Sequence, residues 1–278
     1  GVQQHVDDLA ALIRDELDGV VWLLQPRDER SVRLTWCGVD SSLDIPLAHD
    51  QLSAVLPELA AALGIQRLHF HHLGGLPASI LELPTALGLP FDFTFHDFHT
   101  VCPQTHFISR EGGFCGRPDV SVCEACVADR PDPWGLGIEK WRDTFSQWLT
   151  TAERLIYPTA SVRNIVTEYF PTLTGEVWPH PEPSMVTYQA HTEQSLARKK
   201  FCLIGSLSDV KGLHLLKEMG ALVKTTSEPI DFVVVGPTLA PIGADAVEII
   251  RVTGEFAPQD LPRLLAHERP DGLLFLSI

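Results

Sequence analysis

The sequence is poor in positive charge and lacks most of the short motifs that identify a chemistry. Its 278 residues hold 21 Lys and Arg against 36 Asp and Glu, a formal net charge of −15. Such an acidic chain is unsuited to nucleic-acid phosphate or to docking on anionic lipid through a broad basic face. No uncharged apolar run reaches the roughly 18 residues that a membrane-spanning helix needs. We therefore expect no nucleic-acid partner.

Several catalytic and cofactor motifs are also missing. The chain has no G-x-G-x-x-G, Walker, G-x-S-x-G or H-E-x-x-H segment. No two aspartates are separated by one residue, so an Asp-x-Asp pair for a divalent cation on a diphosphate is absent. We therefore expect no catalytic divalent metal.

The composition is that of an ordinary globular protein. Hydrophobic residues make up 45 %, charged residues 21 %, and the mean hydropathy is +0.07. The length suits two domains. The chain opens directly on a helical pattern and closes on the apolar run 272–278, so we expect both ends to be cut from a longer chain.

Helical and strand-like segments alternate along the chain, which predicts crossover units on parallel sheets. Apolar strands without strict polar alternation predict burial on both faces. The expected helices cover 2–17, 50–63, 77–87, 134–152, 159–169, 211–224 and 258–267. The expected strands cover 20–24, 31–36, 66–71, 91–96, 154–157, 176–178, 201–205, 230–235, 247–252 and 272–276.

We expect two domains joined by a polar connection. The first covers 1–180 and carries a Cys-rich, irregular insert at 98–130. Residues 181–200 form the linker, and 201–278 form a second, incomplete domain.

Four cysteines lie within that insert: Cys102, Cys115, Cys123 and Cys126. The last two form a C-x-x-C pair, a spacing that lets two thiolates reach one tetrahedral metal. A structural zinc is the favoured interpretation, because it would fix a loop with little core of its own. Two disulfides, unlinked thiols and an iron–sulfur cluster are the alternatives.

A histidine and an aspartate end the buried strand 91–96. Ligands of open α/β sheets bind outside the carboxyl ends of the strands, so His96 and Asp97 are candidate site residues. His69, His71 and His72 at the preceding strand end are weaker candidates. The alternatives for His96 are a core histidine bonded to a carbonyl, or a ligand beside the cysteines.

A loop of small residues follows the strand 201–205. It contains Gly205 and Ser206 and leads to Lys211 at the start of a helix. Free amides at a helix N-terminus beside a lysine can hold an anion. An ordinary strand–helix turn is the alternative.

Together these segments resemble the GT-B retaining glycosyltransferases of family 4. Gly205-Ser206 and Lys211-Gly212 resemble the family's G-R-x-x-x-x-K-G segment, with Ser206 in place of the arginine. Gly236 resembles the glycine that follows the next strand of the family's second domain. Gly254 lies in a segment that resembles the family's loop near the nucleotide base. The strand ending at His96 resembles the one that places a histidine against the donor sugar. The cysteine insert is similar to a subgroup that builds bacterial surface polysaccharides such as O-antigen.

The resemblance implies a fold and an activity. Two Rossmann-like domains with parallel sheets would face a cleft that holds a nucleotide-diphosphate sugar. Gly205, Ser206, Lys211, Gly236 and Gly254 would bind this donor, with His96 and Asp97 as catalytic residues. The enzyme would transfer a hexosyl or deoxyhexosyl group to a glycan or lipid-linked acceptor. It would be cytoplasmic, peripheral to the membrane or part of a longer multidomain chain.

Two departures bear on this activity. The family's acidic pair would lie beyond Ile278, and Ser206 removes the arginine of the diphosphate clamp, a stronger phosphate ligand than lysine alone. Whether this fragment is active alone therefore stays open, and a catalytically inactive GT-B-like binding or scaffold module is the alternative. A nucleotide-linked oxidoreductase is a weaker one, because no G-x-G-x-x-G follows a strand.

Overall fold

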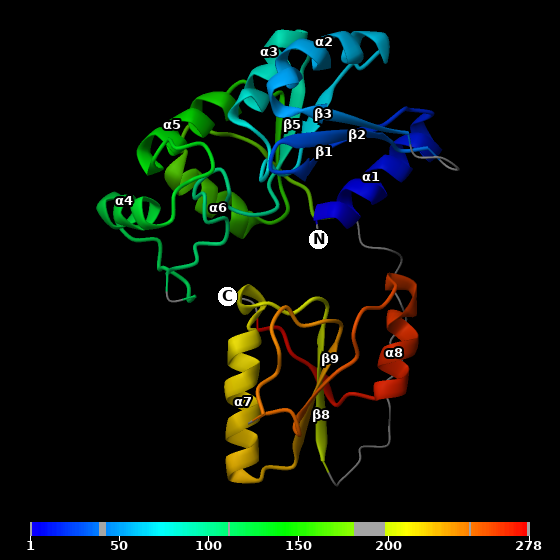
Figure 1. Ribbon diagram of the computed structural model, residues 1–278, viewed down its shortest axis with the longest axis vertical. Coiled ribbons are helices and arrows are strands. Elements are labelled where there is room, and N and C mark those ends of the chain that lie inside the picture. The colour runs from blue at the N-terminus through cyan, green and yellow to red at the C-terminus, as the bar shows by residue number, and fades with distance from the viewer. Residues whose placement is uncertain (1, 39–42, 111, 181–197, 245, 277–278) are drawn as a thin grey trace. The chain divides into compact units, whose positions relative to one another are not determined.

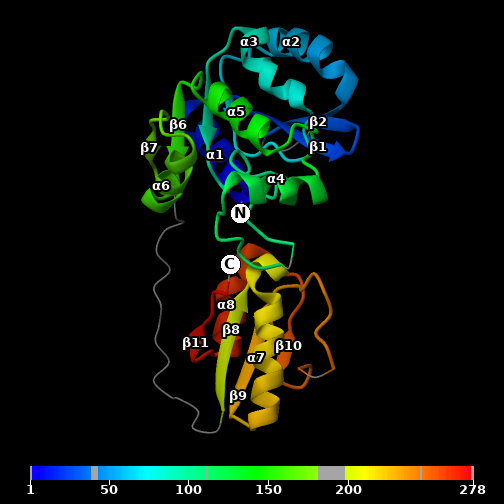
Figure 2. The ribbon, with the colours of Figure 1, turned by 90° about the vertical axis from the view of Figure 1, so that its left-hand side faces the viewer.

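A computed structural model describes residues 2–38, 43–110, 112–180, 198–244 and 246–276 (Figures 1 and 2). The chain divides into two compact units. The first consists of Gly1–Phe107 and Gly116–Pro183, and the second of Ile108–Cys115 and Ser184–Ile278. Of the expected linker 181–200, residues 181–197 lie outside the described residues.

The first unit is built on a parallel sheet with the strand order β4-β5-β6-β7. All four residues of β5 are buried, as expected for a strand covered on both faces. The helices of this unit fall between successive strands or before the sheet. The strands are β4 (Leu68–Phe70), β5 (Phe91–Thr94), β6 (Arg154–Tyr157) and β7 (Glu176–Val177), and the helices are α1 (Val2–Leu17), α2 (Leu52–Ala62), α3 (Leu83–Leu87), α4 (Val120–Asp129), α5 (Ile138–Leu149) and α6 (Ala160–Tyr169), with short 3-10 helices η1 (His49–Gln51) and η2 (Ala78–Glu82).

A separate antiparallel sheet precedes the parallel one. Its order is β1-β2-β3, with β1 at Trp22–Asp28, β2 at Ser31–Trp36 and β3 at Asp44–Ala48. The sequence pattern predicts the first two strands but places them in crossover units, and it does not predict β3. A connection of two residues between β1 and β2 is too short for a parallel crossover, which explains the hairpin.

Aromatic side chains fill the core of the first unit. The rings of Phe95 and Tyr157 stack with centroids 4.5 Å apart, and those of Phe91 and Trp148 stack at 4.7 Å. Trp141 is fully buried and its indole N–H donates to the carbonyl of His99 at 2.9 Å. Helix α5 is therefore held against the sheet and against the chain that follows β5.

The second unit has the parallel strand order β10-β9-β8-β11. Side chains of β9 alternate between two cores: Phe232 and Val234 pack with residues of α7, and Val233 and Val235 pack against α8. Figure 1 accordingly shows α7 and α8 on opposite sides of β8 and β9. The elements are β8 (Lys199–Ile204), η3 (Asp209–Lys211), α7 (Leu213–Thr226), β9 (Ile230–Val235), β10 (Ile250–Val252), η4 (Pro258–Asp260), α8 (Leu261–Glu268) and β11 (Gly272–Leu273).

The predicted α/β class is confirmed, with a parallel four-stranded sheet and crossover helices in each unit. Within the described ranges, no helix combines the length and the apolar character needed to cross a bilayer.

Two local predictions were wrong. The insert is not irregular throughout, because Val120–Asp129 forms helix α4. The tryptophan-rich helix starts at Ile138, so Trp134 precedes it. The reason is Asp132, whose carboxylate accepts the backbone N–H groups of Trp134, Leu136 and Gly137 and fixes a turn there.

Candidate functional site

The predicted site residues fall into two groups, one in each unit. His96 and Asp97 follow β5 in the first unit, and Gly205, Ser206, Lys211, Gly236 and Gly254 follow strands of the second.

Histidines gather at the carboxyl ends of the first sheet. His71 follows β4, His96 follows β5, and His180 lies three residues beyond β7. Because the strands are parallel, these ends share one edge of the sheet. With His5 of α1 and His69 of β4, they form what we call the histidine cluster.

The rings of the cluster are in direct contact. His71 Nδ1 lies 3.0 Å from His96 Nε2, a hydrogen bond in which one ring donates and the other accepts. The His5 ring centroid lies 5.1 Å from that of His96 and 4.2 Å from that of His180. His69 stacks on His71 at 4.2 Å, and its Nε2 is 2.8 Å from the hydroxyl of Thr94.

Burial keeps these imidazoles uncharged. Burial removes water from the His71 ring, and neighbouring histidines disfavour a positive charge on it. Together these effects lower the pKa of His71 to about 2. Burial also lowers the pKa of His69 to about 4 and that of His96 to about 4. The pKa values of His5 and His180 are lowered as well, mainly by burial. At neutral pH the cluster therefore presents neutral ring nitrogens, which accept hydrogen bonds or bind metals.

Asp97 lies next to the cluster and is already engaged. Its Oδ2 is 3.0 Å from His72 Nδ1, and its Oδ1 accepts the backbone N–H of His99 at 2.8 Å. Burial raises the pKa of Asp97, but the hydrogen bonds from His72 and from the backbone N–H of His99 outweigh it, so the pKa lies below its ordinary value. This geometry makes Asp97 a residue that holds His72 and the chain after β5.

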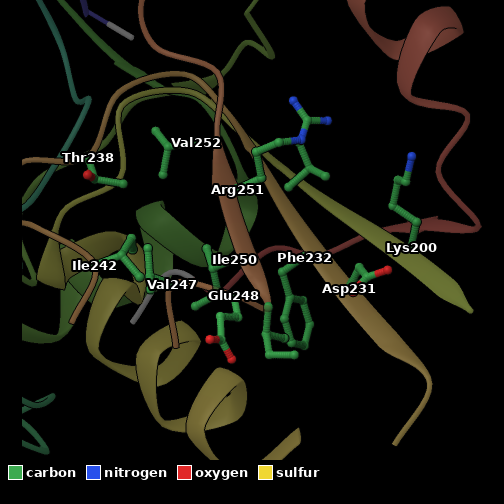
Figure 3. Close-up of a pocket in the computed structure, with 12 residues that line it drawn as sticks. Lys200, Asp231, Phe232, Thr238, Ile242, Val247, Glu248, Ile250, Arg251 and Val252 are labelled. Carbon is green, nitrogen blue, oxygen red and sulfur yellow. The ribbon is translucent and has the colours of Figure 1, made fainter. Parts of the chain in front are cut away.

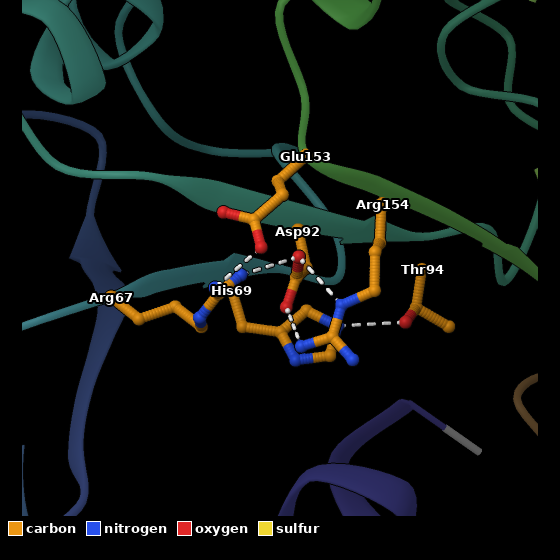
Figure 4. A network of polar contacts seen from close by, with 6 residues as sticks. All are labelled: Arg67, His69, Asp92, Thr94, Glu153 and Arg154. Atoms are coloured by element: carbon orange, nitrogen blue, oxygen red, sulfur yellow. Dashed lines mark hydrogen bonds and ion pairs between the residues drawn. The ribbon is translucent and has the colours of Figure 1, made fainter.

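A second polar network crosses the first sheet beside His69, and sequence reasoning missed it (Figure 4). Asp92 of β5 is only 3 % exposed and accepts hydrogen bonds from Arg67 at 2.8 Å and Arg154 at 3.1 Å. Arg67 also bonds Glu153 at 2.8 Å. These ion pairs tie β4, β5 and β6 together. An aspartate inside an otherwise apolar strand was the signal that could have revealed this network.

In the second unit, backbone glycines bring two strand ends into contact. Gly205 follows β8 with φ +102°, and Gly236 follows β9 with φ +141°. A Cβ on Gly236 would lie 2.3 Å from the carbonyl oxygen of Gly205, so a side chain there is excluded. The N–H of Gly236 donates to the hydroxyl of Thr253 at 3.0 Å, which joins the segment after β10 to the same place.

Lys211 lies over this junction. A Cβ built on Gly205 would be 4.0 Å from Lys211 Nζ. Lys211 ends the turn η3, and Gly212 is the N-cap of α7, so the exposed lysine stands at the start of that helix as predicted. Ser206 is exposed in the same loop, and Gly254 with φ +85° follows Thr253. The structure thus brings Gly205, Lys211 and Gly236 together, with Gly254 one residue from Thr253.

The predicted zinc site is not supported. Among the described residues, Cys102, Cys115, Cys123 and Cys126 do not form a group whose ligand atoms could share a metal ion. Cys115 belongs to the second unit and the other three to the first. Cys123 and Cys126 lie on helix α4 instead of a metal-binding knuckle. Their sulfurs accept guanidinium N–H groups, Cys123 from Arg142 at 3.5 Å and Cys126 from Arg130 at 3.0 Å.

A hollow of about 680 Å³ lies at the β10 edge of the second sheet (Figure 3). Phe232 and Ile250 form part of its apolar wall, and Lys200, Asp231 and Arg251 supply charge. None of the five predicted donor-binding residues lines it.

Comparison with known proteins gives structural similarities only. No family model matches the chain, and no curated protein sequence matches it. A crystal structure of TarM resembles 88 % of the chain with a TM-score of 0.49 and 10 % identity, over 42 % of its own length. A mutant TarM from S. aureus, in complex with fondaparinux, alpha-GlcNAc-glycerol and UDP, has a TM-score of 0.49 and 9 % identity, over 99 % of this chain and 66 % of its own.

The catalytic domain of starch synthase IV from Arabidopsis thaliana, bound to ADP and acarbose, has a TM-score of 0.41 and 15 % identity. That similarity covers 86 % of this chain and 63 % of the synthase domain. The chain thus spans between 42 % and 66 % of the length of these three structures. With TM-scores below 0.5, these similarities alone decide neither the family nor the activity of this chain.

Proposed function

We propose that the chain is part of a GT-B glycosyltransferase that uses a nucleotide-diphosphate sugar as donor. The observation that carries the proposal is the junction in the second unit, where Gly205, Gly236 and Lys211 meet at the carboxyl ends of parallel strands. The same three residues belong to the segments of the second unit that resemble family 4 of these enzymes.

The junction has the properties of a diphosphate site. A Cβ on Gly205 would come within 4.0 Å of Lys211 Nζ alone, so an anion can approach the backbone there beside the lysine. The backbone N–H groups of Lys211, Gly212 and Leu213 already bond to the carbonyls of Ser208 and Asp209, so the start of α7 offers its helix dipole and not the free amides that the sequence predicts. Lys211 adds a full positive charge to a chain whose net charge is −15. This cation would neutralise the charge that develops on the leaving diphosphate, a term worth about 3 kcal/mol for a single well-placed donor.

The finer features of the proposal follow the resemblance. We assign the enzyme to a retaining mechanism, to hexosyl or deoxyhexosyl transfer, and to bacterial surface polysaccharides such as O-antigen made at the cytoplasmic face of the membrane. The acceptor is a glycan or a lipid-linked glycan. His96, a neutral imidazole at a strand end, is the residue that we assign to the donor sugar, with Asp97 holding its surroundings.

Ser206 favours a second candidate, a binding module without turnover. Arginine forms a two-pronged hydrogen-bonded pair with phosphate, whereas serine offers one hydroxyl. The chain would then hold a nucleotide diphosphate weakly and transfer nothing.

Titration calorimetry with UDP, ADP, GDP and dTDP tests the proposal. We expect at least one nucleotide to bind, and Lys211→Ala to weaken it about 10-fold, the loss of one charge-assisted contact. Lys224→Ala is the matched control, since it removes a lysine near the other end of α7 that pairs with Glu248 on the surface. No binding by any nucleotide, or equal losses in the two variants, would contradict the proposed donor site.

A turnover assay separates the two candidates. Nucleotide release from a nucleotide sugar in the presence of a lipid-linked acceptor supports the transferase. Binding without release, in the longest chain that contains this sequence, supports the binding module.

A further inference from the structure

We propose that His5, His71 and His96 bind a transition-metal ion of the Zn²⁺ type. One ring nitrogen from each of the three lies within 4.8 Å of the others. Among the described residues, they form the group of at least three His, Cys, Asp or Glu side chains that is close enough to hold one metal ion. The inference does not depend on glycosyl transfer, because it concerns equilibrium binding of the metal itself.

The three ring nitrogens lie within 4.8 Å of one another and reach tetrahedral spacing when the His5 ring moves by about 1 Å toward the other two. Zn–N bonds of about 2.0–2.1 Å place tetrahedral ligand atoms about 3.4 Å apart. His71 Nδ1 and His96 Nε2 are already 3.0 Å apart, so an ion could replace their hydrogen bond when the rings open by a few tenths of an ångström. His5 lies on the first turns of α1, and its ring is within 5.4 Å of His71 and 5.1 Å of His96, centre to centre.

The surroundings favour a metal over an entirely hydrogen-bonded core. His5 Nδ1 is buried and has no hydrogen-bond partner among the described residues. A buried polar atom without a partner is costly, and so is the removal of several imidazoles from water. Coordination through Nδ1 of His5 would satisfy this buried nitrogen.

Two more histidines support the three ligands from outside. His69 stacks on His71 and is fixed by the hydroxyl of Thr94. His180 stacks on His96 with centroids 4.9 Å apart. Such contacts hold ligand rings in position, a role that second-layer groups fulfil in metal sites.

The donor set selects the class of metal. Imidazole nitrogens suit Zn²⁺, Co²⁺, Ni²⁺ and Cu²⁺, whereas Mg²⁺ and Ca²⁺ prefer oxygen. This is why the absence of an Asp-x-Asp pair, which concerns oxygen-bound cations, does not bear on the cluster. Three protein ligands leave a fourth position for water or an oxygen atom of a bound molecule, as in catalytic zinc sites.

Metal binding by the whole chain tests the inference. After chelator treatment, the protein is dialysed against limiting Zn²⁺ and analysed for bound metal, and Co²⁺ is titrated with optical detection. We expect one ion per chain and a visible Co²⁺ spectrum without the near-ultraviolet band of thiolate ligands. His5→Ala should weaken Zn²⁺ binding by more than about 100-fold. Loss of a residue that only supports a ligand costs up to about 100-fold, and the loss of a ligand itself should cost more.

Two controls locate the site. His106→Ala removes an exposed histidine of the same unit and should leave binding unchanged. The double variant Cys123→Ser with Cys126→Ser should also keep the metal. Loss of the metal in the cysteine variant but not in His5→Ala, or no metal bound by the unaltered protein, would overturn the inference. His5→Gln, which keeps side-chain bulk, and a far-ultraviolet circular dichroism spectrum separate lost ligation from lost folding.

Discussion

Substituting Gly236 tests whether the two strand ends of the second unit meet as the structure shows. An alanine Cβ at this position would lie 2.3 Å from the Gly205 carbonyl oxygen, and the backbone has φ +141°. A non-glycine residue in such a conformation costs about 1–3 kcal/mol, and forced overpacking costs about 1–3 kcal/mol more. Gly236→Ala should therefore destabilise the second unit by about 2–6 kcal/mol.

The effect is large for a unit of this size. In a domain of 60–100 residues, 1 kcal/mol corresponds to a melting shift of about 4–8 °C. We expect the melting temperature of the second unit to fall by about 10 °C or more. Displacement of the Gly205 carbonyl should also move the loop beneath Lys211, so nucleotide binding should weaken in the same variant.

The six tryptophans make the measurement specific. All six lie between Trp22 and Trp178, in the first unit, so tryptophan fluorescence follows that unit alone. Far-ultraviolet circular dichroism follows both units. The expected result is a lowered transition by circular dichroism with an unchanged fluorescence transition.

Gly243→Ala is the matched control. This glycine is in the same unit, and a Cβ there would meet nothing within 4 Å. Its substitution should change stability by less than about 1 kcal/mol. If Gly236→Ala and Gly243→Ala unfold at the same temperature, the close approach of the two backbones is refuted.

Three further predictions concern charge. Ser206→Arg should tighten nucleotide-diphosphate binding about 10-fold in calorimetry, because arginine adds a two-pronged phosphate contact, and Ser208→Arg in the same loop is its control. Asp132→Asn should lower the free energy of unfolding at pH 7 by about 1–3 kcal/mol, since a buried carboxylate that accepts three backbone N–H groups is lost. Burial raises the pKa of Asp132, but the N–H groups of Gly137, Leu136 and Trp134 outweigh it, so its folded pKa lies below the unfolded value. The carboxylate therefore contributes its full stabilisation above the unfolded pKa and loses it as the pH falls through the folded pKa. Urea titrations at pH 7 and pH 3 should show that the loss of stability in Asp132→Asn is smaller at pH 3. Glu268→Gln should destabilise the second unit by about 1–3 kcal/mol in urea, because the side chain is 4 % exposed and pairs with Arg251 and Lys200; an unchanged midpoint would mean that these pairs add nothing.

The sequence was sufficient for features that depend on local pattern. Strands such as Phe91–Thr94 and Ile230–Val235 are short segments rich in Phe and Val and bounded by turn residues, and the helices between them keep a helical period. The loop from Gly205 to Lys211 was also predictable, because its place after a parallel strand follows from chain order. The roles of its residues stay predictions.

Features that depend on contacts between distant segments could not be predicted. Spacing allowed Cys123 and Cys126 to share a metal, but spacing does not exclude a helix, and nothing local indicated that Arg130 and Arg142 would contact the thiols. The predicted start of α5 was wrong for a similar reason. The spacing of the tryptophans predicts a helix from Trp134, but three backbone N–H groups bond to Asp132 and fix a turn there instead.

The histidine cluster shows the same limit most clearly. His96 was identified by its position at a strand end, and His71 was a weaker candidate on the same ground. His5 carried no signal, because a histidine in an amphipathic helix is ordinary, and His180 lies 84 positions beyond His96. Only the parallel order β4-β5-β6-β7, with α1 against its carboxyl edge, brings the rings of His71, His96 and His180 each within 5.4 Å of the His5 ring. Each histidine is unremarkable by itself, whereas three ring nitrogens within 4.8 Å form a chemically distinct unit, so the sheet order creates the candidate metal site.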